Sequence, residues 1–157
     1  MPDKPDGPAH DSRAAADPTI WDPEVERLDA AECWRLISAE GVGRLAYDGQ
    51  FGLTVLPVRY QLDHGSLVFR IALGSPTDED LRTGIRGAEY RVAVEIDDVG
   101  AEVPDGWFVL IQGDAHHADP GADRASAAAA GVEPSAGAEH LVRITPAVIT
   151  GRRLRRR

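Results

Sequence analysis

Short stretches of alternating apolar and polar residues, separated by tight-turn signals, recur along the chain from residue 42 to residue 154. They predict β-strands, because alternate side chains of a strand point to opposite faces of a sheet. Asp48-Gly49 and His64-Gly65 supply two of the turn signals. Strands joined mostly by tight turns favour a small antiparallel barrel over a parallel sheet, so the predicted fold class is mainly β. The six expected strands span residues 42–49, 51–63, 66–73, 90–99, 106–118 and 140–154.

Prolines interrupt two of the expected strands. Pro57 lies within residues 51–63. Since proline has no N–H to donate to a neighbouring strand, Pro57 is expected at a sheet edge or a bulge. Pro146 is expected to bend the last strand.

A helix is expected before the first strand, in "LDAAECWRLISAEGVG", residues 28–43. Asp29 suits the N-cap position, and Glu32 three residues later completes a capping box. Gly41 is a suitable residue to end the helix. The buried stripe is expected to be Cys33, Leu36 and Ile37, with Cys33 as a small hydrophobic residue.

Further short helices are expected between the later strands. One begins at Ser75, directs Leu81 and Ile85 inward and ends near Gly87. An alanine-rich segment at residues 121–131 has the composition of another helix.

The composition fits one globular domain. The chain has 157 residues, 43% of them hydrophobic and 27% charged. Residues 1–27 are rich in Pro, Asp, Ala and Gly and are expected to form a mobile arm. Residues 28–154 form the expected folded domain, and residues 155–157 form a basic tail.

Charge and cysteine content restrict the partners and the compartment. The net charge of −9 argues against general binding to nucleic acid. No apolar run reaches 18 residues and the N-terminus lacks the apolar core of a secretory signal, so neither a membrane span nor secretion is expected. Cys33 is the only cysteine, which fits a reducing cytoplasm.

The segment "VFRIALGSPTDEDL", residues 68–81, raises the question of an anion site. Arg70 lies near the end of a strand, and Ser75 before Pro76 suits the N-cap of a helix. Backbone N–H groups at a helix start and a nearby arginine favour a phosphate. Asp78, Glu79 and Asp80 in the first turn have the charge of a phosphate and favour a well-capped helix instead. Both interpretations stay open from the sequence.

Five segments occur in a characteristic order and spacing: "ECWRLISAEGVGRLAY", "LPVRYQLDHGSLVFRIALGS", "VAVEIDD", "GWFVLIQGDA" and "RITPAVITGRRL". In this order they resemble the pyridoxamine 5′-phosphate oxidase-like family of flavin-binding split β-barrels, most closely its short actinobacterial members. The resemblance covers roughly residues 28–154. It implies a six-stranded antiparallel split barrel of the FMN-binding type that forms a homodimer with two FMN sites at the subunit interface.

The resemblance also implies which residues contact the cofactor. Segment 56–60 would lie along the isoalloxazine ring, and segment 70–72 would approach the ring and the ribityl-phosphate chain. Ser75 and its neighbour Thr77 would hold the phosphate, and Trp107 would come from the other subunit. The cofactor-binding residues expected on this basis are Leu56, Pro57, Val58, Arg59, Tyr60, Arg70, Ile71, Ala72, Ser75, Thr77 and Trp107.

The chain departs from the family pattern at the phosphate. Relatives commonly have Arg-Thr-Ala at the strand end and a lysine after Gly-Ser or Gly-Thr. Here Ile71 replaces the hydroxyl residue, and Pro76 or Thr77 replaces the lysine. Losing two charge-assisted hydrogen bonds would weaken a ligand by roughly two to four powers of ten.

Several other polar residues have two interpretations each. Arg59 would pair with an anionic flavin or with the phosphate of F420, or it is an edge-strand arginine beside Pro57. Arg70 needs an anion, either a ligand or a carboxylate such as Asp97 or Asp98.

Metal binding by His116-His117 is not expected. Adjacent residues of a strand point to opposite faces, and the sequence shows no further partner that would converge on either one. Arg152 and Arg153 match the Gly-Arg-Arg that closes the family pattern, and no chemical role is assigned to them.

Three functions are compatible with these residues. The first is a flavin-dependent oxidoreductase that uses FMN on an unknown small molecule; no catalytic residue set is predicted, since the flavin would carry the chemistry. The second is a split-barrel binding or regulatory module that has lost FMN. The third is a barrel that uses F420, or last of all haem, for which His64, His116, His117 and His140 are the available histidines.

Overall fold

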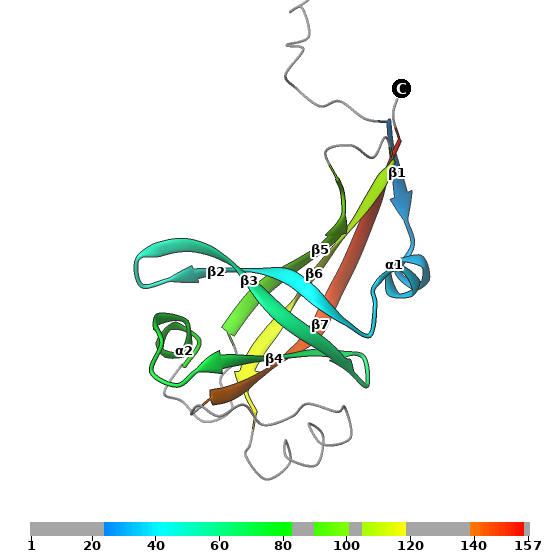
Figure 1. Cartoon of the computed structure of the whole chain (residues 1–157). Coiled ribbons are helices and arrows are strands. Elements are labelled where there is room, and N and C mark those ends of the chain that lie inside the picture. The colour runs from blue at the N-terminus through cyan, green and yellow to red at the C-terminus, as the bar shows by residue number, and fades with distance from the viewer. Residues whose placement is uncertain (1–23, 83–89, 101–104, 119–138, 156–157) are drawn as a thin grey trace, which may run out of the picture.

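The computed structural model describes residues 24–82, 90–100, 105–118 and 139–155. Strands dominate it, as predicted (Figure 1). In chain order the elements are β1 (Glu24–Leu28), α1 (Ala30–Leu36), β2 (Glu40–Gly49), β3 (Gly52–Asp63), β4 (Ser66–Ala72), α2 (Pro76–Asp80), β5 (Tyr90–Asp98), β6 (Gly106–His117) and β7 (Glu139–Arg155).

The predicted six-stranded antiparallel barrel is confirmed by β2 to β7. The strand order is β1-β7-β4-β3-β2-β5-β6, and β6 also pairs with β7. This last pairing closes the six strands β2 to β7 into a ring in which every neighbouring pair is antiparallel. The long β7 holds the ring together, because it pairs with β6 along most of its length and with β4 at its beginning.

A seventh strand extends the sheet beyond the prediction. β1 pairs with the end of β7, with Glu24 opposite Arg155 and Leu28 opposite Gly151. Its first four residues belong to the segment 1–27 that was predicted as a mobile arm, so residues 24–27 are part of the sheet and not of an arm. The sequence did not show this strand because its side chains are mostly exposed, and only Leu28 is buried. The rest of the predicted arm lies outside the described residues.

One predicted turn is confirmed and another is misplaced. His64 and Gly65 join β3 to β4 with φ values of 47° and 80°, as a two-residue hairpin turn requires. Between β2 and β3, Gly49 is paired with Gly52, so the turn consists of residues 50 and 51 and not of Asp48-Gly49. The positive φ, 102°, falls on Gly52, which fixes the register two residues later than predicted.

Both prolines have the expected effects. At Pro57, β3 pairs with Arg44 of β2 only, since the pairing of β3 with β4 is confined to Tyr60–Asp63. Pro57 therefore lies at a local sheet edge. At Pro146 the register between β6 and β7 shifts by one residue, which is a β-bulge.

Helix α1 has the predicted start but an earlier end. Asp29 accepts a hydrogen bond from the Glu32 N–H at 2.8 Å, and Glu32 accepts one from the Asp29 N–H at 3.0 Å. The helix ends at Leu36 with an extended C-cap at Ile37, so the predicted end at Gly41 is wrong.

The apolar side of α1 faces the barrel. Cys33 is completely buried there and Ile37 nearly so, while Leu36 is half-buried against the core. Burial raises the pKa of the Cys33 thiol, which fits its expected role as a small hydrophobic residue.

The barrel interior is an aliphatic core. Its fully buried large side chains include Leu45, Leu67, Val94, Val109, Ile111, Val142 and Ile144. α1 and α2 lie at opposite ends of the barrel (Figure 1). Among the described residues, no helix has the length and apolar character needed to cross a bilayer. Ile85, Gly87 and the predicted helix at residues 121–131 lie outside the described part of the chain.

Candidate functional site

A cavity of about 800 Å³ opens between β3 and β4 and reaches the start of α2. Its size is typical of a cofactor pocket. Every residue predicted to contact a cofactor lines it, except Trp107. The complete lining is Glu40, Gly41, Val42, Leu56, Pro57, Val58, Arg59, Tyr60, Gln61, Val68, Phe69, Arg70, Ile71, Ala72, Ser75, Thr77, Glu139 and Leu141.

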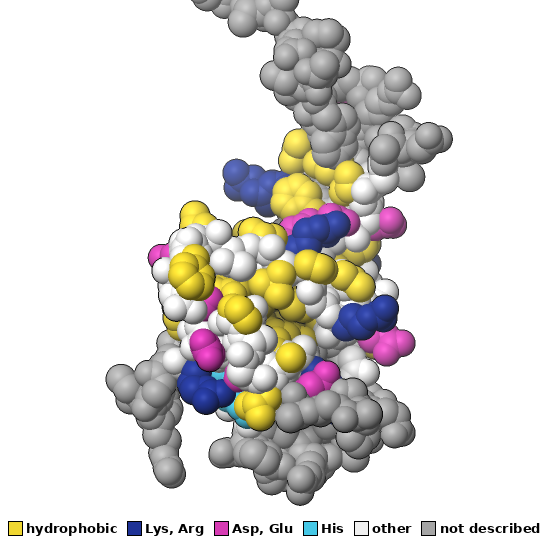
Figure 2. Space-filling model, turned by 60° about the vertical axis from the view of Figure 1, so that its left-hand side comes forward, with side chains coloured by type: hydrophobic (Ala, Val, Ile, Leu, Met, Phe, Trp, Pro, Cys, Tyr) yellow, Lys and Arg dark blue, Asp and Glu magenta, His cyan; other side chains and the backbone are white. Residues whose placement is uncertain are grey.

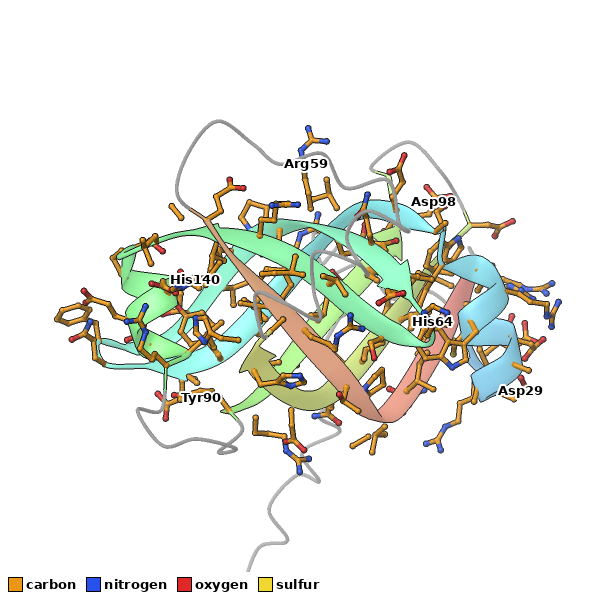
Figure 3. The ribbon with its side chains drawn as sticks, turned by 90° about the horizontal axis from the view of Figure 1, so that it is seen from below. Asp29, Arg59, His64, Tyr90, Asp98 and His140 are labelled. Atoms are coloured by element: carbon orange, nitrogen blue, oxygen red, sulfur yellow. The ribbon has the colours of Figure 1, made fainter. Side chains whose placement is uncertain are left out.

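The part of β3 that lines the cavity has one buried face and one exposed face. Val58 and Tyr60 are buried in the core, whereas Pro57 and Arg59 alternate with them and face outward. Figure 3 shows the Arg59 side chain extending away from the barrel. Tyr60 donates to the Ser38 carbonyl at 3.3 Å, and a Cβ on Gly41 would lie only 2.9 Å from its hydroxyl oxygen. Gly41 is thus needed for this tight approach rather than for ending α1.

The cavity contains an ion pair. Arg70 Nη1 lies 3.8 Å from Glu139 Oε2, and both side chains are about three-quarters buried. Asp97 or Asp98 had been predicted as the partner of Arg70. The prediction is wrong for Asp97, because its carboxylate accepts a hydrogen bond from Arg44 at 2.9 Å. The reason is the strand order, since β5 lies beside β2 while β4 lies beside β7, which begins with Glu139.

The start of α2 is well capped, which was one of the two open interpretations. The helix ends at Asp80 with Leu81 as its C-cap, earlier than the predicted end near Gly87. The Ser75 hydroxyl accepts a hydrogen bond from the Asp78 N–H at 3.2 Å, with Pro76 in the first helical position. The Gly74 N–H, with φ of 73° at Gly74, donates to Asp78 Oδ2 at 2.8 Å. Two backbone donors that could hold a phosphate, the Gly74 and Asp78 N–H groups, are therefore engaged within the chain, whereas the Ser75 hydroxyl keeps its own proton to donate.

The acidic residues of α2 do not enter the cavity. Ser75 and Thr77 line it, but Asp78, Glu79 and Asp80 do not. Asp80 accepts from the Gln50 N–H at 3.2 Å, and Glu79 is exposed. The predicted repulsion between these three carboxylates and a phosphate is consequently weaker than their sequence positions suggest. The charged residues that do line the cavity are Arg59, Arg70, Glu40 and Glu139.

Asp78 is the centre of a polar cluster behind the cavity wall. Its side chain is completely buried, and its Oδ1 lies 2.7 Å from His117 Nε2 and 2.6 Å from His140 Nδ1. Its Oδ2 accepts from Arg82 at 2.7 Å and from the Gly74 N–H. Figure 3 shows His140 beside α2. Sequence reasoning missed this cluster, since it joins α2 to the end of β6 and the beginning of β7.

Two opposing effects set the pKa of Asp78. Burial would raise it, but hydrogen bonds from His140, the Gly74 N–H and His117 together outweigh burial and hold the pKa well below its ordinary value. The carboxylate is therefore ionised throughout the neutral range.

Trp107 and the arginines of the last strand lie away from this cavity within one chain. Trp107 is paired with Asp98 and Arg153 and packs partly buried against the core. Arg152 donates to the Gly151 carbonyl at 2.8 Å, and Arg153 lies 3.8 Å from Glu26 of β1. One protomer therefore does not bring Trp107 to the predicted site.

A family model described as pyridoxamine 5′-phosphate oxidase matches residues 29–153, which is most of the chain. The chain belongs to this family. The match spans the cavity and the whole barrel, and thus confirms the resemblance found in the sequence.

Solved structures of similar proteins support the assignment. The FAD-binding protein from Mycobacterium smegmatis is 30% identical, with a TM-score of 0.67 over 83% of this chain and 100% of that one. An FAD-binding protein from Mesorhizobium loti is 20% identical, with a TM-score of 0.64 over 85% and 98%. A heme-binding protein from Mycobacterium smegmatis is 20% identical, with a TM-score of 0.58 over 78% and 53%. The last two show the shared fold. Among curated proteins, none matches the chain.

Proposed function

We propose that the protein binds a flavin, preferably FMN, in the cavity between β3 and β4 and acts in the cytoplasm as a flavin-dependent oxidoreductase on a small molecule. The cavity carries this proposal, because segments 56–60 and 70–72 come together there with Arg70 in a chain of the pyridoxamine 5′-phosphate oxidase family. The 30% identical relative is an FAD-binding protein, which supports a flavin as the ligand class.

The lining residues suit a flavin in two ways. Leu56, Pro57 and Val58 contribute apolar groups to the wall against which a flat aromatic ring would lie, and Arg70 offers a partly buried cation for the phosphate. When bound, the flavin would supply hydride and electron transfer. The chain's own residues would bind it, orient it and limit its contact with water. A substrate would reach the ring from the open side, where Arg59 faces solvent.

Two features support alternatives to FMN binding. Arg59 at the mouth would suit the additional phosphate of F420. The engaged N–H groups of Gly74 and Asp78 favour the alternative of a binding module that has lost its flavin.

Titration of the purified protein with FMN, FAD and F420, followed by visible absorption and fluorescence, tests the proposal. We expect saturable binding of FMN, one per chain, with quenched flavin fluorescence. If only F420 showed saturable binding, the cofactor would be F420 and not FMN. The absence of saturation by any of the three would leave the flavin-free binding module as the function.

A homodimer is part of the same proposal. Phe51 of the β2–β3 turn and Leu53 and Val55 of β3 form an exposed apolar stripe, with exposed fractions of 89%, 89% and 67%. Figure 2 turns the side with the β2–β3 hairpin forward and shows hydrophobic side chains gathered there. The next residue on the same face of β3 is Pro57, which lines the cavity, so a partner chain on the stripe would cover the flavin.

Leu53→Glu is expected to convert the dimer into a monomer, because it places a charge in the middle of this stripe. Mass measurement by light scattering on a size-exclusion column checks the result. Gln112→Glu, an exposed position on β6, serves as the control and should leave the mass unchanged. A monomeric wild-type protein at micromolar concentration would refute the dimer.

A further inference from the structure

We propose that Asp78, His117 and His140 form a binding site for one divalent first-row transition metal ion, for which zinc is the best fit. The three ligand atoms lie within 4.8 Å of one another. They are the Oδ1 of Asp78 and the imidazole nitrogens Nε2 of His117 and Nδ1 of His140. Two imidazoles and one carboxylate are a common three-residue set for zinc with a fourth position left to water.

Three separate elements converge on this point. Asp78 comes from α2, His117 is the last residue of β6 and His140 is the second residue of β7. The two imidazole rings are nearly perpendicular, at 87°, with centroids 5.1 Å apart. Each ring therefore directs a nitrogen at the same carboxylate oxygen without stacking on the other ring.

The two oxygens of Asp78 have different partners, as expected for a carboxylate that coordinates through one oxygen. Oδ2 is fixed by the Gly74 N–H at 2.8 Å and by Arg82 at 2.7 Å, while Oδ1 faces both histidines. Such outer hydrogen bonds orient carboxylate ligands in metal sites. The Arg82 side chain is about half exposed, so solvent screens its charge from the ion.

The movement needed for metal binding is small. Zinc–ligand bonds of about 2.0–2.1 Å in a tetrahedron put neighbouring ligand atoms ~3.3 Å apart. The nitrogen-to-Oδ1 distances are 2.6 and 2.7 Å, so each histidine would withdraw by ~0.6–0.7 Å. His117 and His140 retain exposed fractions of 21% and 36%, which gives an ion and a water ligand access from solvent.

The site is distinct from the proposed flavin cavity. Glu139 and Leu141 on either side of His140 line the cavity, so His140 points to the opposite face of β7. Thr77 also lines the cavity, immediately before Asp78. A bound ion would hold the beginning of α2 against β6 and β7 and would stiffen the cavity wall. The fourth position would hold a water ligand, and the presence of the ion does not depend on flavin binding.

The test uses full-length protein with its affinity tag removed, stripped with a chelator and then titrated with Zn²⁺ by calorimetry and with Co²⁺ by visible absorption. We expect one strong site per chain and, with Co²⁺, the intense visible bands of a four-coordinate complex. Zinc is also expected to raise the melting temperature. His117→Ala should weaken binding by at least ~100-fold, because it removes a ligand.

His116→Ala is the matched control, since this neighbour points to the other face of β6 and lies outside the cluster. It should bind zinc like the wild type. His140→Gln provides a second loss of a ligand with less disturbance of packing, and circular dichroism verifies the fold of each variant. Failure of the wild type to bind Zn²⁺ at 1:1 stoichiometry, or equal affinity in the His116 and His117 variants, would overturn the proposal and leave a metal-free hydrogen-bonded cluster.

Discussion

Replacing Asp78 with alanine is expected to lower the free energy of unfolding by about 1–3 kcal/mol. The wild-type carboxylate is completely buried and joins Arg82, the Gly74 N–H and two histidines. Its removal leaves the Gly74 N–H without its acceptor and opens a cavity. It also removes the anion beside the cationic Arg82, whose side chain is about half exposed. Urea unfolding followed by circular dichroism, with a chelator present so that no metal contributes, measures the change.

Glu79→Ala is the control for this prediction. Glu79 is the next residue of the same helix and is also acidic, but it is exposed. Its replacement is expected to change the free energy of unfolding by less than about 0.5 kcal/mol. A loss below about 1 kcal/mol for Asp78→Ala, or equal losses for both variants, would show that the cluster does not anchor α2.

Replacing Arg70 with glutamine is expected to weaken FMN binding by about tenfold to hundredfold, equivalent to about 1.5–3 kcal/mol. The reason is the loss of a charge-assisted hydrogen bond to the phosphate inside the cavity. Glu139→Gln is expected to act in the opposite direction and tighten FMN binding, because it removes a carboxylate 3.8 Å from the guanidinium. Fluorescence titration of both variants measures the two changes.

Riboflavin is the control ligand, since it has the same ring and ribityl chain but no phosphate. Its affinity is expected to be nearly the same in the wild type and in both variants. If Arg70→Gln weakened riboflavin as much as FMN, Arg70 would act on the ring or on the fold, and the assignment of Arg70 to the phosphate would be wrong.

Local sequence signals predicted most of the fold. The capping box of Asp29 and Glu32 and the Ser75 cap depend on residues three apart, so both could be recognised without tertiary information. The His64-Gly65 turn was equally local. The Asp48-Gly49 signal failed because the residue that takes positive φ is Gly52, and nothing in the local pattern distinguishes the two glycines. β1 was missed because its exposed side chains give no buried stripe.

The polar contacts of the site were predicted less well, because they depend on strand order. Arg70 pairs with Glu139 and not with Asp97, because β4, which contains Arg70, lies beside β7, which contains Glu139. His116 and His117 were expected to point to opposite faces of the strand, which agrees with the structure. The sequence did not show that His117 lies close to Asp78 and His140, because these residues are 39 and 23 positions away from it. The cavity residues were found through the family resemblance and not through their pattern of polarity.

The central claim is that a flavin occupies the cavity between β3 and β4, and a crystal structure of the protein with FMN tests it most directly. The account predicts electron density for the isoalloxazine ring along Leu56–Tyr60, with the phosphate within hydrogen-bond distance of Arg70. It also predicts that a second chain covers the ring. FMN bound elsewhere on the barrel, or an empty cavity in crystals grown with saturating FMN, would contradict the account.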